Sequence, residues 1–125
     1  MTEPRIHEQS HEPLTNYLRT HRLKTGFTQR DLARVLGSVN HDTISRYERG
    51  ELLPSLVVAL SYEILYRVPV SEIFAGLTET VAFNIEAQLD AFEDDLGNQS
   101  AQGSRAVAIA RKLQWLSERR STGRT

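Results

Sequence analysis

The sequence contains no cysteine, and this absence removes several kinds of site at once. Disulfides, zinc sites with thiolate ligands, iron–sulfur clusters and cysteine nucleophiles are all excluded, and the absence suits a reducing compartment. No run of about 18 apolar residues occurs, so we expect no contact with a membrane. The first residues, MTEPRIHEQSHEP, lack the apolar stretch of a signal peptide.

Motifs for catalysis are also missing. The sequence shows no phosphate-binding loop, no acid pair that predicts a pocket, and no serine with a placed base. Two of the four histidines, His7 and His11, are four residues apart, but they lie in a polar segment without periodicity. We therefore expect no enzyme, no cofactor and no metal site.

The net charge is −1, but the charged residues are unevenly distributed along the chain. Residues 14–50 carry seven basic and three acidic side chains, whereas residues 77–99 carry six acidic and no basic ones. Residues 100–125 are basic again, with six basic side chains and one acidic one. The first block would suit a polyanionic partner, and the last two blocks complement each other.

Apolar residues recur at helical spacing, and no alternating run indicates a strand. The 125 residues therefore predict an all-α chain with seven helices. Residues 1–12 are expected to be a mobile tail, residues 13–76 a five-helix domain, and residues 77–125 a C-terminal segment of two amphipathic helices. The helices are expected near residues 14–26, 29–36, 41–49, 56–66, 71–74, 78–96 and 104–120. The fourth, apolar on nearly all sides, is expected to be the most buried.

The second and third of these helices are short and joined by a tight turn. The third has a thin apolar side, Ile44 and Tyr47, and is otherwise polar. A helix of this kind fits the major groove of DNA, which is about 12 Å wide and admits one helix. The pair therefore indicates a DNA-binding unit.

The residues of this unit also resemble a known family. The segments GFTQRDLARVLG (26–37) and TISRYERG (43–50), then Pro54-Ser55 and VPVSEIF (68–74), resemble the lambda-repressor-like helix-turn-helix family, also called the xenobiotic-response-element family. The resemblance covers roughly residues 14–76. It implies a sequence-specific transcriptional regulator, in the cytoplasm of a prokaryote or in a phage or plasmid context, that binds double-stranded DNA through helix 41–49.

The resemblance implies a role for individual residues. For base readout it indicates Arg46 first, because a guanidinium pairs bidentately with guanine, and then His41, Asp42 and Ser45. For phosphate contact it indicates Gln29, Thr43, Arg49, Arg30 and Arg19. Arg22 and Glu48 match a family pair that forms a structural ion pair between the first and third helices.

The chain departs from the family pattern in one place. The step from Gly37 to Thr43 is one residue longer than usual. In the simplest alignment Ser38 is the insertion, Val39 is the buried turn residue and Asn40 caps the third helix. In a second alignment Asp42 is the cap, so the positions of His41 and Asp42 stay open.

The two C-terminal helices carry apolar stripes that the five-helix domain does not need. We expect these stripes to form a homodimer, which would read an inverted repeat with two recognition helices one DNA turn apart. Trp115 is expected to be a core anchor. In the alternative reading the protein is an antitoxin or another regulator whose C-terminal helices bind a different protein. The expected dimerisation residues are Val81, Ile85, Leu89, Phe92, Leu96, Ile109, Leu113 and Leu116.

Overall fold

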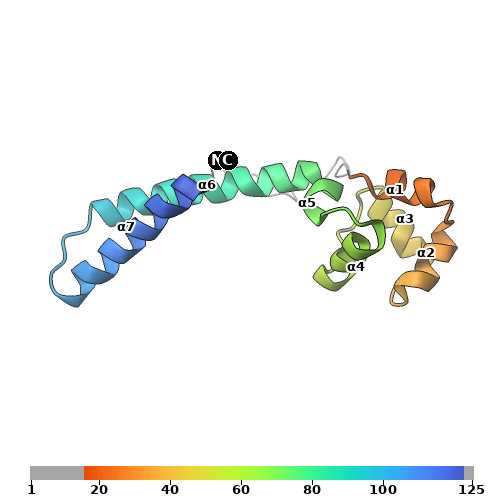
Figure 1. Ribbon diagram of the computed structural model, residues 1–125, viewed down its shortest axis with the longest axis horizontal. Coiled ribbons are helices and arrows are strands. Elements are labelled where there is room, and N and C mark those ends of the chain that lie inside the picture. The colour runs from red at the N-terminus through yellow and green to blue at the C-terminus, as the bar shows by residue number, and fades with distance from the viewer. Residues whose placement is uncertain (1–15, 123–125) are drawn as a thin grey trace. The chain divides into compact units, whose positions relative to one another are not determined.

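The computed structural model describes residues 16–122, and every regular element among them is a helix. Figure 1 shows the seven helices in chain order. This confirms the predicted all-α class, and the predicted tail, residues 1–12, lies outside the described residues. The helices are α1 (Leu18–Thr25), α2 (Gln29–Leu36), α3 (His41–Glu48), α4 (Leu56–Tyr66), α5 (Val70–Ile73), α6 (Ala75–Gly97) and α7 (Ser104–Thr122).

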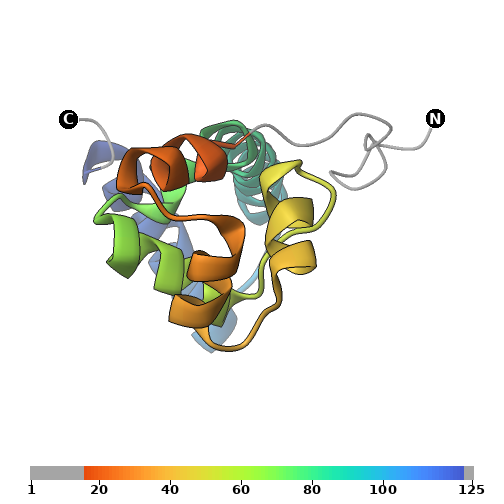
Figure 2. The ribbon, with the colours of Figure 1, turned by 90° about the vertical axis from the view of Figure 1, so that its right-hand side faces the viewer.

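The described chain forms two compact units, divided between Val81 and Ala82. In the first unit, helices α1 to α5 surround one core, as Figure 2 shows. Each helix contributes apolar side chains from one face, so no single helix needs to be apolar all round. The buried members of this core are Leu18, Leu32, Ile44, Tyr47, Val58, Tyr62, Ile73 and Phe74.

Helix α4 has three buried residues, more than any other described helix, as predicted, but much of its apolar surface is exposed. Only Val58, Ala59 and Tyr62 of this helix are buried, while Leu56 and Ile64 are among the most exposed apolar residues of the chain. The unit is small, so α4 meets its neighbours along one face and leaves the other open. Composition alone could not separate these two faces, because both are apolar.

The sequence predicted that the first unit ends at Gly76, but it does not. Gly76 lies in the first turn of α6, which starts at Ala75 and continues past it. One glycine inside a helix costs only about 1 kcal/mol, which a helix of 23 residues tolerates. Leu77, one residue further, packs against the core of the first unit.

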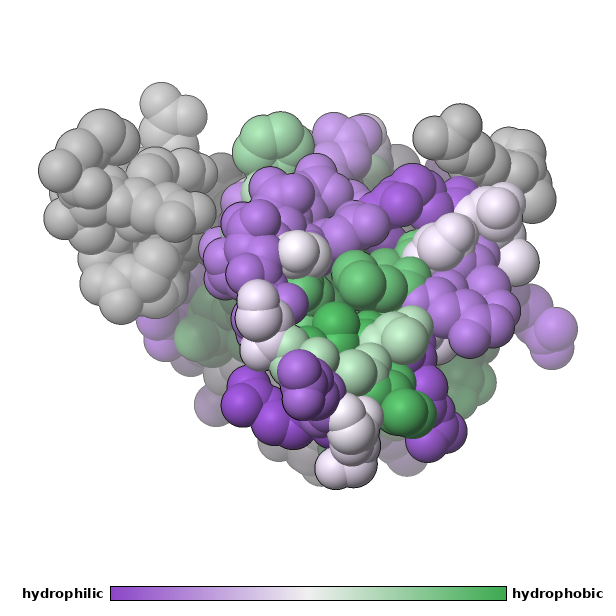
Figure 3. Space-filling model, turned by 90° about the vertical axis from the view of Figure 1, so that its left-hand side faces the viewer, coloured by the Kyte–Doolittle hydropathy of each residue, from purple (hydrophilic) through white to green (hydrophobic). Residues whose placement is uncertain are grey.

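The second unit is a hairpin of α6 and α7, which run antiparallel (Figure 1). Ion pairs join the helices, between Arg119 and Glu86 at 2.6 Å and between Arg120 and Glu93. Seen from its loop end, this unit shows apolar side chains within a ring of hydrophilic ones (Figure 3). Among residues 16–122, no helix combines the length and the apolar character that crossing a membrane requires.

Candidate nucleic-acid interface

Helix α2 begins with a complete capping box. The Thr28 Oγ1 accepts from the backbone N–H of Asp31 at 3.0 Å, and the Asp31 carboxylate accepts from the N–H of Thr28 at 3.0 Å. Aspartate thus fills the position that glutamate usually occupies. The first N–H groups of a helix point out of its start, where they attract an anion such as phosphate. The start of α2 is therefore well ordered for a phosphate contact.

The turn between α2 and α3 settles the open alignment in favour of Asn40. Its Oδ1 accepts from the N–H of Thr43 at 2.9 Å, so Asn40 is the N-cap and α3 begins at His41. Gly37 closes α2 with a φ of 81°, a left-handed conformation that favours glycine. Val39 packs against the core, as the first alignment predicts. The extra residue is accommodated in the turn, and Asp42 is not the cap.

Helix α3 has two sharply different faces. Ile44 and Tyr47 are buried in the core. At about 100° per residue, the opposite side of the helix carries four polar side chains. These are Asp42, Ser45, Arg46 and Arg49, and three of them are exposed while Ser45 is half-buried.

An ion pair between Arg22 and Glu48 attaches α3 to α1. The Arg22 Nε donates to Glu48 Oε2 at 2.7 Å and Nη2 donates to Oε1 at 3.1 Å. A third donor, Arg22 Nη1, reaches the carbonyl oxygen of Phe27 at 2.9 Å. The hydrogen bonds to the carboxylate raise the pKa of Arg22 above its ordinary value, although burial opposes this. The family pair is thus bidentate, and it also fixes the turn before α2.

Gln29 joins the same network from the start of α2. Its Nε2 donates to Glu48 Oε1 at 3.1 Å. A primary amide has two N–H donors and one carbonyl acceptor, so this bond leaves a second N–H for another acceptor. The network therefore holds the Gln29 side chain beside the start of α2, and it couples the α2 start to the end of α3.

Asn16 also helps to hold α3 in place, and the sequence reasoning missed it. Its Nδ2 donates to the carbonyl oxygen of Tyr47 at 3.0 Å, and its Oδ1 accepts from the N–H of Leu18 at 2.9 Å. Asn16 thus binds the first N–H group of α1 and the last turn of α3 at once, while Tyr17 is the N-cap residue of α1. An asparagine just before a helix is a known cap signal, but its reach to α3 depends on tertiary structure and leaves no trace in sequence.

The predicted contact residues differ in how free they are. Arg46 is exposed, and its guanidinium makes no ion pair or hydrogen bond within residues 16–122. Arg49 instead pairs with Glu51 at 2.8 Å and also donates to Ser45 Oγ. His41 Nε2 lies 3.2 Å from the carboxylate of Asp42. The other predicted phosphate contacts are exposed at Arg19 and Arg30 and half-buried at Thr43.

The residues predicted for dimerisation fall into two groups. Leu96 and Leu116 are buried within the hairpin, and Leu89, Ile109 and Leu113 are half-buried. Val81, Ile85 and Phe92 are exposed. Trp115 is not a core anchor, because 57% of it is exposed.

The comparisons with known proteins agree with this geometry. A family model described as Helix-turn-helix matches residues 18–73, the span from the start of α1 to the end of α5. No curated protein and no solved structure matches the chain. The matched family consists of DNA-binding regulators and is typically non-enzymatic. Residues 18–73 therefore belong to the lambda-repressor-like helix-turn-helix family.

Proposed function

We propose that the protein is a sequence-specific transcriptional regulator that inserts α3 into the major groove of DNA. The observation that carries this proposal is the division of α3 into a buried side, Ile44 and Tyr47, and a polar side opposite it. The bonds from Arg22, Gln29 and Asn16 support it, because a recognition helix must be held rigidly to read base edges.

Arg46 is the residue best suited to read a base. It lies on the polar side of α3, is exposed, and has no partner to give up within residues 16–122. An arginine fork donates to guanine O6 and N7 together, the commonest specific contact with DNA. Ser45, His41 and Asp42 are secondary readers, and each must first give up a partner to contact a base. Ser45 accepts a hydrogen bond from Arg49, and His41 and Asp42 contact each other.

Phosphate contacts would then position α3 without reading the sequence. Gln29 offers its second amide N–H next to the start of α2, where the helix dipole favours an anion. Arg19, Arg30 and Thr43 complete this group. Arg49 belongs to it as well, since its exposed pair with Glu51 is worth little and can be exchanged for phosphate.

The exposed side of the hairpin supports a homodimer. Phe92 and Trp115, on different helices, line one pocket of about 280 Å³, together with Leu89, Leu116, Arg111 and Lys112. Val81 and Ile85 lie on the same side of α6 as Phe92, at separations of eleven and seven residues, which are near-whole numbers of turns. A second hairpin would cover this apolar side. Its acidic α6 would then meet the basic residues Arg111 and Lys112.

The alternative of a different protein on this side of the hairpin remains a second candidate. The same exposed Phe92 and Trp115 favour it, because large aromatic side chains dominate binding energies at protein interfaces. A partner that copurifies at a fixed ratio and that Trp115→Glu removes would identify this function.

Selection of random duplexes by the full-length protein tests the leading proposal. We expect an enriched site with two-fold symmetry and half-site centres about one DNA turn, 34–36 Å, apart. The affinity for this site should exceed that for unrelated DNA by at least about 10³ at physiological salt. Enrichment of no sequence would refute specific binding, and a single asymmetric half-site would refute the dimer while leaving α3 as the reader.

A further inference from the structure

Four apolar residues form a continuous exposed ridge on α4, and DNA recognition does not use it. Leu56, Leu60 and Ile64 follow one another at steps of four, and Val57 lies beside them, so all four share one side of the helix. Their exposed fractions are 73% for Leu56, 72% for Val57, 44% for Leu60 and 76% for Ile64. We call these residues the α4 ridge.

The α4 ridge has the composition of an interface between identical chains. None of its members is charged, and the loop before α4 adds exposed Leu52 and Leu53. The core of a protein interface is depleted of charge, and contiguous apolar patches on a protein surface mark interaction sites. DNA is a poor occupant, because its phosphates demand polar and basic groups. In Figure 2, α4 and α3 lie on opposite sides of the first unit.

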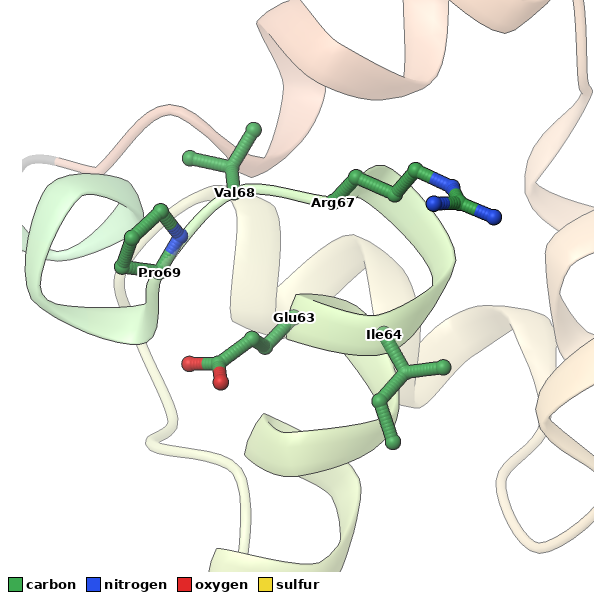
Figure 4. Close-up of a pocket in the computed structure, with 5 residues that line it drawn as sticks. All are labelled: Glu63, Ile64, Arg67, Val68 and Pro69. Atoms are coloured by element: carbon green, nitrogen blue, oxygen red, sulfur yellow. The ribbon is translucent and has the colours of Figure 1, made fainter.

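A pocket adjoins one end of the α4 ridge. Ile64, at the C-terminal end of the ridge, lines it together with Glu63, Arg67, Val68 and Pro69, and its volume is about 470 Å³. Figure 4 shows these side chains around the last turn of α4 and the chain that follows it. The other end of the ridge, about 12 Å away along the helix, carries Leu56 and Val57. The surface thus has apolar side chains at one end and a hollow at the other.

We propose that the α4 ridge binds the α4 ridge of a second copy of this chain, with the two helices antiparallel. A two-fold axis near Leu60 brings the Leu56 end of each helix to the Ile64 pocket of the other, so one contact is made twice. Charges agree with this arrangement, because Glu51 precedes the ridge, Arg67 follows it, and an antiparallel pair places them at the same end. Glu51 pairs with Arg49 of its own chain, and this exposed pair would have to be shared or exchanged. The side chains of the α4 ridge are spaced four residues apart. Two helices that pack through such rows of side chains form the commonest class of helix packing.

The size of the surface sets the conditions for this pairing. A stable interface takes about 20–30 residues a side, and the α4 ridge with its loop and pocket offers well under that number. The pairing is therefore weak between free chains. It strengthens when the proposed pairing of hairpins raises the effective concentration of one ridge near the other.

Single cysteines test the geometry, because the natural chain has none. Full-length chains carrying Leu60→Cys, Leu56→Cys or Ile64→Cys would be treated with a short bismaleimide, with Thr20→Cys on exposed α1 as the control. We expect Leu60→Cys to give crosslinked dimers at least about tenfold faster than Thr20→Cys, because a bismaleimide joins only thiols that approach closely. In a mixture of the Leu56→Cys and Ile64→Cys proteins, the two variants should crosslink to each other faster than either variant crosslinks to itself.

Two outcomes would overturn the proposal. Crosslinking of Leu60→Cys at the control rate would show that a second copy does not cover the ridge. Equal crosslinking rates for the three cysteine variants, and for the mixture of Leu56→Cys with Ile64→Cys, would show that the ridges touch but are not antiparallel. Adding Val57→Glu to Leu60→Cys should abolish the crosslink, while circular dichroism should stay unchanged because Val57 is exposed. The mass of each variant in solution reports the hairpin pairing separately, and binding to the selected duplex reports DNA recognition separately.

Discussion

Arg22 and Glu48 form a bidentate ion pair in which the glutamate side chain is only 2% exposed. The two residues are 26 positions apart and join the middle of α1 to the last residue of α3. Because Gln29 donates to the same carboxylate, one glutamate determines how three helices meet. Its loss should therefore change both the stability of the first unit and the placement of the polar side of α3.

Glu48→Ala should lower the free energy of unfolding by about 3 kcal/mol, because it leaves the Arg22 charge poorly solvated and unpaired. The double variant Arg22→Met/Glu48→Leu should recover most of this loss, since it removes both charges. Urea unfolding of the three proteins measures the difference. If the double variant is no more stable than Glu48→Ala, the cost comes from lost packing and not from an unpaired charge.

Replacement of Arg46 should separate charge from base readout. Arg46→Ala should cost about 1–3 kcal/mol on the selected duplex and relax the preference at one or two positions in each half-site. Arg46→Lys keeps the charge but loses the planar fork, so it should relax the same preference with a smaller loss of affinity. Repeated selection with each variant measures both effects. Arg105→Ala, on exposed α7, is the matched control and should keep the parent preference.

Gln29→Ala should weaken binding to all duplexes alike, because phosphate contacts carry no sequence information. Gln29 is neutral, so the slope of affinity against salt should stay unchanged, whereas Arg30→Ala should reduce that slope by about one. Gln29→Glu should weaken binding much more, since it adds a negative charge facing phosphate and also places a second carboxylate against Glu48. A change of base preference in Gln29→Ala would contradict this role.

The sequence predicted the first unit well because its signals are local. Thr28 and Ser55 cap α2 and α4, and glycines end α1 and α2, so the bounds of these helices depend on contacts within a few residues. The Arg22–Glu48 pair was found only through the family resemblance, since no local rule joins residues 26 apart. Asn16 shows the limit of this reasoning, because its contact with α3 exists only after folding.

Exposure was the least predictable property, for a physical reason. In α4 and in the hairpin, apolar side chains cover more of the helix than one neighbour can bury. A sequence shows that Leu56, Ile64 and Trp115 are apolar, but it does not show that the neighbouring helices of the same unit leave them exposed. These excess apolar surfaces are where binding to other molecules is expected.

Tyr62 and Tyr66 should make the protein sensitive to alkali. Burial raises the pKa of Tyr66 from its ordinary value near 10 to about 12, and it raises that of Tyr62 as well. The folded state thus prefers neutral phenols. The contribution of these two tyrosines to stability should be constant below pH 10, where tyrosines in the unfolded chain are neutral, and should fall as pH rises from 10 towards 12.

The variants Tyr62→Phe and Tyr66→Phe test this dependence. Neither hydroxyl has a hydrogen-bond partner within the described residues, so Tyr62→Phe should raise stability at pH 8 by about 1 kcal/mol. Both variants should flatten the loss between pH 8 and 11 in urea unfolding. Tyr17→Phe is the control, because Tyr17 is exposed and should change neither value. A stability profile of Tyr66→Phe that matches the parent at pH 11 would contradict the assignment.

A charge on the exposed side of the hairpin should dissociate the proposed homodimer. Phe92→Glu or Trp115→Glu removes an aromatic side chain from the pocket and places a charged carboxylate on the side that the second hairpin would cover, and moving a charge out of water is costly. Sedimentation should then show monomers, and affinity for the two-fold duplex should fall while affinity for a half-site is kept. Phe83→Glu is a matched control on the same helix, because nine residues separate it from Phe92 and place it on the opposite side of α6. Phe83 is more exposed than Phe92, at 74% against 45%, so exposure alone cannot explain a loss confined to Phe92 and Trp115. Dissociation by Phe83→Glu as well would mean that both sides of α6 are covered, and the two-hairpin arrangement would have to be replaced by a larger assembly.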